Sequence, residues 1–312
     1  MRKPRLSVLL AAVLIAGSLW PALASDKNDV NDIGNRRVAH RSIISQEKEI
    51  AIGKEISTEI DHQAKLVTDP VINEYVNRVA QNVARNSDLK IPLTVKVIDD
   101  PTINAFTLPG GFIYVNSGTL QAADEEDQLA GVIAHEIGHA AARHWAQQMT
   151  RATILQYAML PVMFTPMSIG TYYGVEAAMN GIPIAFLKFN RSAEAEADEL
   201  GLQYMYKAGY DPTSFVDFFE RVRLMEKKNS GILNRVFSPH PMTNSRIKAA
   251  QKEIQQILVP KTEYVVNTSE FNDVKDRLTR LQEHRRLQAD NDWSRPRLRQ
   301  RPGMVLDGSM RQ

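Results

Sequence analysis

The sequence predicts a mostly helical α+β domain that contains a small sheet. Residues 46–65 and 71–85 carry apolar side chains at helical spacing. Residues 93–98, Leu-Thr-Val-Lys-Val-Ile, alternate with a period of two, which is typical of a strand. Residues 124–127 are all acidic and precede a long apolar run, so they suit the positive end of a helix dipole.

The chain opens with the three parts of a secretory signal peptide. Three basic residues among the first five precede an apolar run over residues 6–20, and Ala22-Leu-Ala24 is an A-x-A cleavage site. We expect residues 1–24 to be removed and the polar residues 25–45 to form a flexible leader. The alternative is an uncleaved anchor, although the apolar run is short for a span of about 20 residues.

The composition restricts both the partners and the compartment. Cleavage after Ala24 leaves 35 basic and 36 acidic residues, a net charge of about −1, so no nucleic-acid partner is expected. The chain has no cysteine, which excludes disulfides, thiolate catalysis, cysteine-bound zinc and a lipid-modified cysteine. With the signal peptide, this predicts a protein of the bacterial periplasm.

Further elements follow in order along the chain. Asp69-Pro70 separates the first two helices, and residues 112–115 form a second strand candidate after Pro109-Gly-Gly111. Residues 153–187 are apolar but interrupted by proline and glycine. They are interpreted as short helices or a mobile flap near the site, as ordinary core with loops, or as a peripheral membrane contact.

The C-terminal half continues with helices and ends in a basic tail. Residues 192–207 are helical up to Gly209, and Asp211 is a good N-cap for a helix over residues 215–227. Residues 290–312 contain alternating arginines and are expected to be disordered. The organised domain is therefore expected to span residues 46–289.

The chemistry centres on His135-Glu136-Ile-Gly-His139. Histidines at positions i and i+4 lie on one face of a helix, so both imidazoles can bind one metal ion. Glu136 can reach a water on that metal, and this H-E-x-x-H pattern is typical of zinc-assisted peptide hydrolysis. A chance match on an exposed helix is the simpler alternative, but the apolar residues 130–134 predict buried histidines that need partners.

A second motif, Glu194-Ala-Glu196-Ala-Asp198, offers the third ligand. Glu194 and Asp198 are four residues apart and share a helical face, so Glu194 can bind the metal while Asp198 holds a ligand histidine by its other ring nitrogen. Glu196 points elsewhere and is expected to be solvated. The His2Glu set favours Zn²⁺, one ion per chain.

With these residues the chain resembles the gluzincin metallopeptidases, which include the periplasmic BepA-like proteases, the membrane HtpX-like proteases and the CAAX-prenyl endopeptidases. The resemblance covers roughly residues 46–281. Beyond the two zinc motifs, it involves Asn104-Ala-Phe106 with Pro109-Gly-Gly111, and Ser238-Pro-His240-Pro241 with Arg246. Only about 50 residues follow Pro260, too few for the helical-repeat domain of the BepA-like subgroup.

The resemblance implies a zincin-like metalloprotease domain whose sheet has an edge strand beside the active-site cleft. His135, His139 and Glu194 would bind zinc, and Glu136 would be the general base. Asn104 and Ala105 would lie on the edge strand and bind substrate as an added strand. His240 and Arg246 would face the cleft, and His240 would either stabilise the oxyanion or bind the zinc as an inhibitory fourth ligand.

The expected function is a periplasmic zinc endopeptidase that degrades unfolded or misassembled envelope proteins. Glu136 would take a proton from a zinc-activated water, and His240 or Arg246 would stabilise the oxyanion. The first alternative is a chaperone or assembly factor whose zinc site is latched by His240. The second is a structural zinc protein, in which Glu136 would have no purpose.

Overall fold

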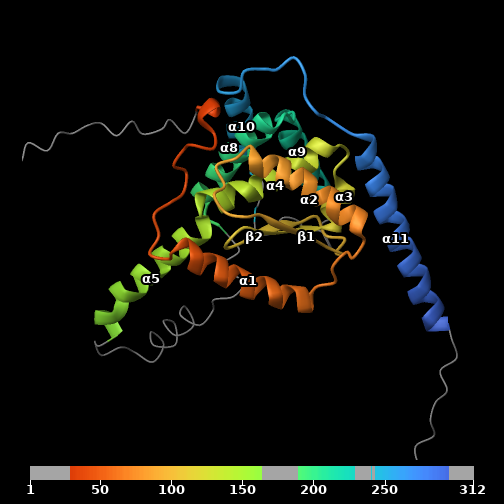
Figure 1. The fold of residues 1–312 in the computed structure, drawn as a ribbon, viewed down its shortest axis with the longest axis horizontal. Helices are drawn as coiled ribbons and strands as arrows, with labels where there is room; N and C mark the ends of the chain where they lie inside the picture. The colour runs from red at the N-terminus through yellow and green to blue at the C-terminus, as the bar shows by residue number, and fades with distance from the viewer. Residues whose placement is uncertain (1–28, 164–188, 229–239, 241–242, 295–312) are drawn as a thin grey trace, which may run out of the picture.

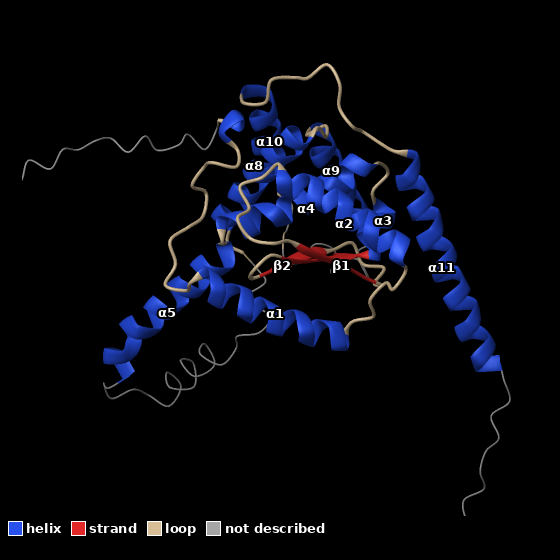
Figure 2. Ribbon diagram, viewed as in Figure 1, coloured by secondary structure: helices blue, strands red, loops and turns tan. Residues whose placement is uncertain are grey.

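A computed structural model describes residues 29–163, 189–228, 240 and 243–294. In this part of the chain, helices surround one small sheet (Figure 1). Coloured by secondary structure, the molecule is mostly helix with strands only near its middle (Figure 2). The expected class, a mostly helical α+β zincin-like domain, is confirmed. Residues 1–24, expected to be a signal peptide, lie outside the described residues.

The sheet has three strands in the order β1-β3-β2. Strands β1 (Thr94–Ile98) and β3 (Phe112–Asn116) are parallel, and β2 (Ala105–Leu108) is antiparallel to β3. The β2–β3 turn requires glycine, because Gly110 has φ +77° and an added Cβ would lie 2.5 Å from the Ile50 Cα. Because β3 lies between the other two strands, β2 is an edge strand, as expected.

Helices cover both faces of this sheet. Helix α1 (Gln46–Gln63) lies on one face, and α2 (Pro70–Arg85) and α4 (Glu126–Ala142) lie on the other (Figure 1). Helix α2 begins as its sequence predicts, with the Asp69 side chain accepting from the N–H groups of Val71 and Ile72. Every residue of α4 is buried, so the motif helix is the centre of the core.

Helix α8 (Arg191–Ala208) packs very closely against α4. A Cβ added to Gly138 would lie 2.9 Å from the Ala197 carbonyl oxygen, and one added to Gly201 would lie 3.0 Å from the His135 nitrogen. These two glycines allow the two helix backbones to approach. Helix α8 ends at Gly209, which has φ +92°, as the sequence predicts.

Six further helices complete the described part of the chain. They are η1 (Val30–Asp32), α3 (Ser117–Ala122), α5 (His144–Met163), α9 (Thr213–Lys228), α10 (Asn244–Gln256) and α11 (Ser269–Ser294). Helix α5 extends away from the body (Figure 1) and exposes Ile154, Leu155 and Tyr157. Among the described helices, none is long and apolar enough to cross a membrane.

Two expected boundaries differ from the structure. Residues 29–45 of the expected leader pack on the domain, because Ile33 and Val38 are buried and the buried Arg36 pairs with Asp88 at 2.6 Å. A few anchoring side chains inside a polar segment are enough to order it. At the other end, residues 290–294 belong to α11, and residues 295–312 lie outside the described part.

The interrupted apolar stretch is only partly described. Its first residues continue α5 as far as Met163, so this part is one helix. The expected flap or set of short helices falls on residues 164–188, which lie outside the described residues.

Candidate metal centre

Helix α4 brings its two motif histidines together. The Nε2 atoms of His135 and His139 lie 3.1 Å apart, and the two residues are 3% and 2% exposed. This is the arrangement that the i, i+4 spacing predicts.

Glu194 faces both histidines from the first turn of α8. That helix begins with Asn190, whose side chain accepts from the N–H groups of Ser192 and Ala193. The Glu194 carboxylate lies 3.6 Å from His135 Nε2 and 3.7 Å from His139 Nε2. Ligand atoms around a tetrahedral zinc ion are about 3.3 Å apart, given bonds of about 2.0–2.2 Å. The spacing of the three side chains therefore suits zinc.

His240 completes what we call the inner cluster: His135, His139, Glu194 and His240, whose ligand atoms lie within 4.8 Å of one another. His240 Nδ1 lies 2.8 Å from Glu194 Oε1. Its Nε2 lies 3.7 Å from Glu136 Oε1, and both of these buried atoms lack a hydrogen-bond partner. Buried polar atoms require partners, so the residues fit a bound cation and a water beside Glu136.

A threonine of the edge strand orients Glu136. Thr107 Oγ1 lies 2.8 Å from Glu136 Oε2 and 2.9 Å from the Glu136 carbonyl oxygen. Sequence reasoning missed Thr107, because an alternating strand position does not indicate which helix residue it contacts. The contact places β2 directly beside the site. Ala105 is the first residue of β2, and Asn104 precedes the strand.

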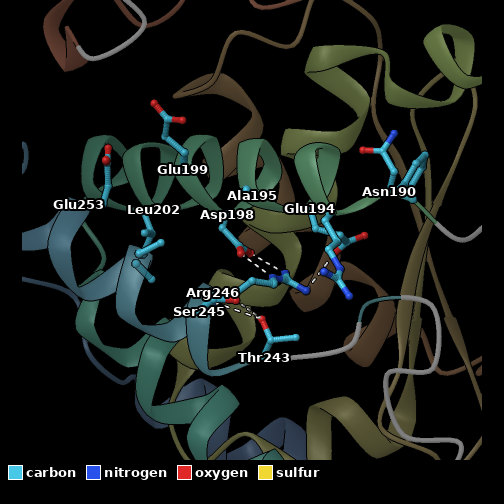
Figure 3. Close-up of a pocket in the computed structure, with 14 residues that line it drawn as sticks. Asn190, Glu194, Ala195, Asp198, Glu199, Leu202, Thr243, Ser245, Arg246 and Glu253 are labelled. Carbon is cyan, nitrogen blue, oxygen red and sulfur yellow. Dashed lines mark hydrogen bonds and ion pairs between the residues drawn. The ribbon is translucent and has the colours of Figure 1, made fainter.

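Asp198 and Arg246 support the ligands from behind. Asp198 Oδ1 lies 3.0 Å from His135 Nδ1, where sequence reasoning expected it. Arg246, on α10, donates to Asp198 through Nε and Nη2, both at 2.7 Å, and its Nη1 lies 2.9 Å from Glu194 Oε2 (Figure 3). Arg246 was expected to act on an oxyanion in the cleft. In the structure its guanidinium is instead engaged with two carboxylates.

The negative charge of Glu194 and the neutral ring of His139 suit a cation, and His135 must lose a proton when the cation binds. Burial lowers the pKa of His135, but Asp198 and Glu194 outweigh it and raise the pKa to about 9. Burial, and then the positive charge of His135, lower the pKa of His139. Burial raises the pKa of Glu194, but its hydrogen bonds to His135 and His240 outweigh this and hold the pKa well below its usual value. The carboxylate is therefore an anion, and His139 keeps a free lone pair.

A cavity of about 970 Å³ reaches the back of the site between α8 and α10 (Figure 3). Phe189, Glu194, Asp198 and Arg246 are among the residues that line it. The carboxylates of Glu194 and Asp198 therefore border this cavity.

The expectation that Glu196 is solvated is wrong. Glu196 belongs to what we call the outer cluster, His40, His144 and Glu196, whose ligand atoms also lie within 4.8 Å of one another. Its Oε2 lies 2.7 Å from His40 Nε2 and 3.3 Å from His144 Nε2. The spacing of five residues between His139 and His144 is not a same-face helical spacing, so the sequence held no signal for this contact.

A buried His2Glu set with a glutamate between its histidines, in a zincin-like domain, defines a metal-dependent peptidase site of the H-E-x-x-H type. Comparison with known families agrees, since residues 70–254 match the model of peptidase family M48. The match spans more than half of the chain. The chain therefore belongs to this family.

Three relatives illustrate the relationship. The beta-barrel assembly-enhancing protease of Escherichia coli is 27% identical over 318 residues, covering 96% of this chain and 62% of that protein. The protein of the same name from Yersinia pestis is 27% identical over 264 residues, covering 80% and 52%. The mitochondrial metalloendopeptidase OMA1 of Saccharomyces cerevisiae is 34% identical over 165 residues, covering 51% and 46%. The chain thus spans about half to three fifths of these relatives.

Proposed function

We propose that this chain is a zinc-dependent endopeptidase that acts in the periplasm on misfolded or misassembled envelope proteins. The observation that carries the use of zinc is the convergence of His135, His139 and Glu194 beside the unpartnered Glu136 Oε1. The names of the bacterial relatives, with the signal-peptide pattern of the sequence, support the compartment and the substrate class.

The chemistry divides between the ion and the side chains. Zinc, when held by His135, His139 and Glu194, supplies Lewis acidity that polarises a carbonyl and activates water. Glu136 takes the proton of the attacking water on Oε1 and later passes it to the leaving amine. Thr107 holds the other carboxylate oxygen, so that Oε1 faces the reacting atoms. Strand β2 offers its free edge to the main chain of an extended substrate near Asn104 and Ala105.

Replacement of the general base tests this mechanism. Glu136→Gln should lower kcat about 10²- to 10⁴-fold on an unfolded outer-membrane protein, because the amide cannot accept the proton. Zinc content and thermal stability should stay at the wild-type level. Glu55→Gln, an exposed change on α1, is the matched control and should cleave normally. Wild-type turnover by Glu136→Gln would rule out the mechanism.

His240 supports a second candidate, a latched assembly factor that cuts rarely. Its Nδ1 contacts the ligand Glu194 and its Nε2 faces Glu136, so it occupies the space a substrate carbonyl would need. If His240 is an inhibitory ligand, His240→Ala will cleave faster than the wild type. If it stabilises the oxyanion, the same variant will cleave more slowly.

Helix α5 supports a peripheral membrane contact. Ile154, Leu155 and Tyr157 are 58%, 63% and 67% exposed on a helix that extends from the body (Figure 1). Full-length protein should float with vesicles that contain anionic lipid, and replacing all three residues by serine should abolish flotation. Equal flotation of both proteins would assign the three side chains to another role.

A further inference from the structure

The outer cluster is linked to the inner cluster through a break between two helices. Arg143 ends α4 in the left-handed conformation with φ 56°, the only positive φ at a non-glycine position in the described residues. This conformation is unfavourable for arginine, but its Nε donates to Glu49 at 2.7 Å and its Nη2 to the Ile44 carbonyl at 2.8 Å. The break starts α5 at His144 and turns that ring back onto His139.

The rings of His139 and His144 meet through their Nδ1 atoms, so the contact uses the His139 nitrogen that does not face the metal position. His139 Nδ1 and His144 Nδ1 lie 2.9 Å apart, and His144 is 1% exposed. Phe189 stacks on His139 with centroids 4.1 Å apart and an interplanar angle of 18°. The imidazole of His139 is thus held by a flat apolar face and by one polar contact.

Beyond His144 the contacts continue to a carboxylate and a third histidine. His144 Nε2 lies 3.3 Å from Glu196 Oε2, and His40 Nε2 lies 2.7 Å from the same oxygen. Glu196 follows the ligand Glu194 by two residues on α8. His40 is held in place by its backbone N–H, which donates to the Ala142 carbonyl at 3.0 Å. Glu196 lies on α8 and His40 is hydrogen-bonded to the end of α4, so both are fixed to the helices that carry His135, His139 and Glu194.

Metal binding would determine the hydrogen positions along this series. A metal on His139 Nε2 leaves the ring hydrogen on Nδ1, which donates to His144 Nδ1. The His144 hydrogen must then sit on Nε2, where it points at the Glu196 carboxylate. We propose that His144 is a positioning residue that orients His139 for the metal, and that Glu196 and His40 hold His144 in the required tautomer. This inference rests on the proposed zinc site.

The same reasoning argues against a second metal ion in the outer cluster. An ion there would need the lone pair of His144 Nε2, which moves the hydrogen to Nδ1. Two N–H groups would then face each other across 2.9 Å, because His139 Nδ1 already carries a hydrogen. An ion in the outer cluster and zinc in the inner cluster therefore exclude each other.

Zinc affinity of the full chain, measured by competition with a chromophoric chelator, tests the inference without using activity. His144→Leu should raise the zinc Kd about 10- to 100-fold, as loss of such supporting contacts does. His144→Asn should restore most of the affinity, because its amide oxygen can take the place of Nδ1. Glu196→Gln should fall between these variants, and His62→Leu, an exposed change on α1, should match the wild type.

The visible spectrum of the cobalt-substituted protein gives a second readout. Its bands should shift in His144→Leu and return in His144→Asn, whereas a purely structural role would lower stability without this pattern. A wild-type zinc Kd for His144→Leu, or equal losses in both His144 variants, would overturn the inference. Two zinc ions per chain, with one lost in Glu196→Gln, would also overturn it. A wild type that binds no zinc would remove the proposed function itself.

Discussion

The inner and outer clusters are built from the same residue types, and α8 supplies the glutamate of each, yet they differ in their contacts. The outer cluster is internally satisfied, since Glu196 Oε2 contacts both of its histidines at 2.7 and 3.3 Å. In the inner cluster, the Glu194 carboxylate lies 3.6 and 3.7 Å from His135 and His139. Beside it, Glu136 Oε1 and His240 Nε2 have no hydrogen-bond partner.

This difference separates a metal site from a hydrogen-bonded support. In the inner cluster His135 Nε2 and His139 Nε2 face each other at 3.1 Å beside two unpartnered buried atoms, which fits a cation, whereas in the outer cluster each histidine shares a hydrogen with Glu196. Burial adds to the contrast only at His40, whose side chain is 27% exposed, because His144 is as buried as His135 and His139. A count of histidines and carboxylates does not distinguish the two clusters, but the unpartnered buried atoms beside the inner cluster do.

A large effect outside the ligands themselves is expected at Asp198, the carboxylate that supports the inner cluster. Asp198→Asn should raise the zinc Kd about 10- to 100-fold, because the amide holds His135 Nδ1 less strongly and leaves Arg246 without a full counter-charge. Chelator competition measures this. Asp273→Asn, an exposed change on α11, should bind zinc as the wild type does. An unchanged Kd for Asp198→Asn would mean that the support has no influence on the ligand.

The close approach of α4 and α8 holds both clusters together. Gly138→Ala should lower the free energy of unfolding by about 1–3 kcal/mol, because the new methyl group would lie 2.9 Å from the Ala197 carbonyl oxygen. Urea unfolding of the apo-protein measures the change. Gly131→Ala on the same helix is the control, since its methyl group would meet the movable Met205 side chain at 3.2 Å. Equal losses in both variants would contradict a specific role for the α4–α8 contact.

The smallest effect concerns an acid on α4 that lies apart from both clusters. Burial, and then the charge of Glu125, raise the pKa of Asp127 from 3.8 to about 7. The unfolded chain ionises this group near pH 4 and the folded chain does so near pH 7, so its contribution makes stability fall as pH rises between these values. Asp127→Asn should therefore gain at least about 1 kcal/mol relative to wild type across this window.

Paired urea titrations at pH 4, 5.5 and 7 measure that gain. A difference between the two proteins that stays constant with pH would contradict the raised pKa. The comparison with Asp198 is direct, because burial raises the pKa there too, but Arg246 and His135 outweigh it and lower the pKa overall. Two buried carboxylates thus shift in opposite directions according to their partners.

Part of the site follows from helical spacing alone. His135 with His139, and Glu194 with Asp198, are each four residues apart, and the structure places each pair on one face as expected. The start of α2 at Pro70 and the end of α8 at Gly209 follow from local cap chemistry in the same way. These features depend only on neighbours in sequence.

The rest of the site depends on contacts between distant segments, which the spacing of residues does not encode. Glu196 was expected to be solvated, but the segment before α1 and the turn at Arg143 bring His40 and His144 to it. Thr107 is buried against Glu136 only because β2 packs on α4. Arg246 meets Asp198 only because α10 packs on α8. Each of these partners lies on an element that the sequence does not place.

We expect the inner cluster to bind zinc and the outer cluster not to bind it. The most direct measurement is the zinc content of purified residues 25–312 by elemental analysis, with Glu194→Ala and Glu196→Ala measured alongside. We expect one zinc per chain in the wild type, a sharp loss in Glu194→Ala and retention in Glu196→Ala. A folded wild type that binds no zinc when zinc is supplied, or zinc that is lost with Glu196 and kept without Glu194, would contradict this expectation.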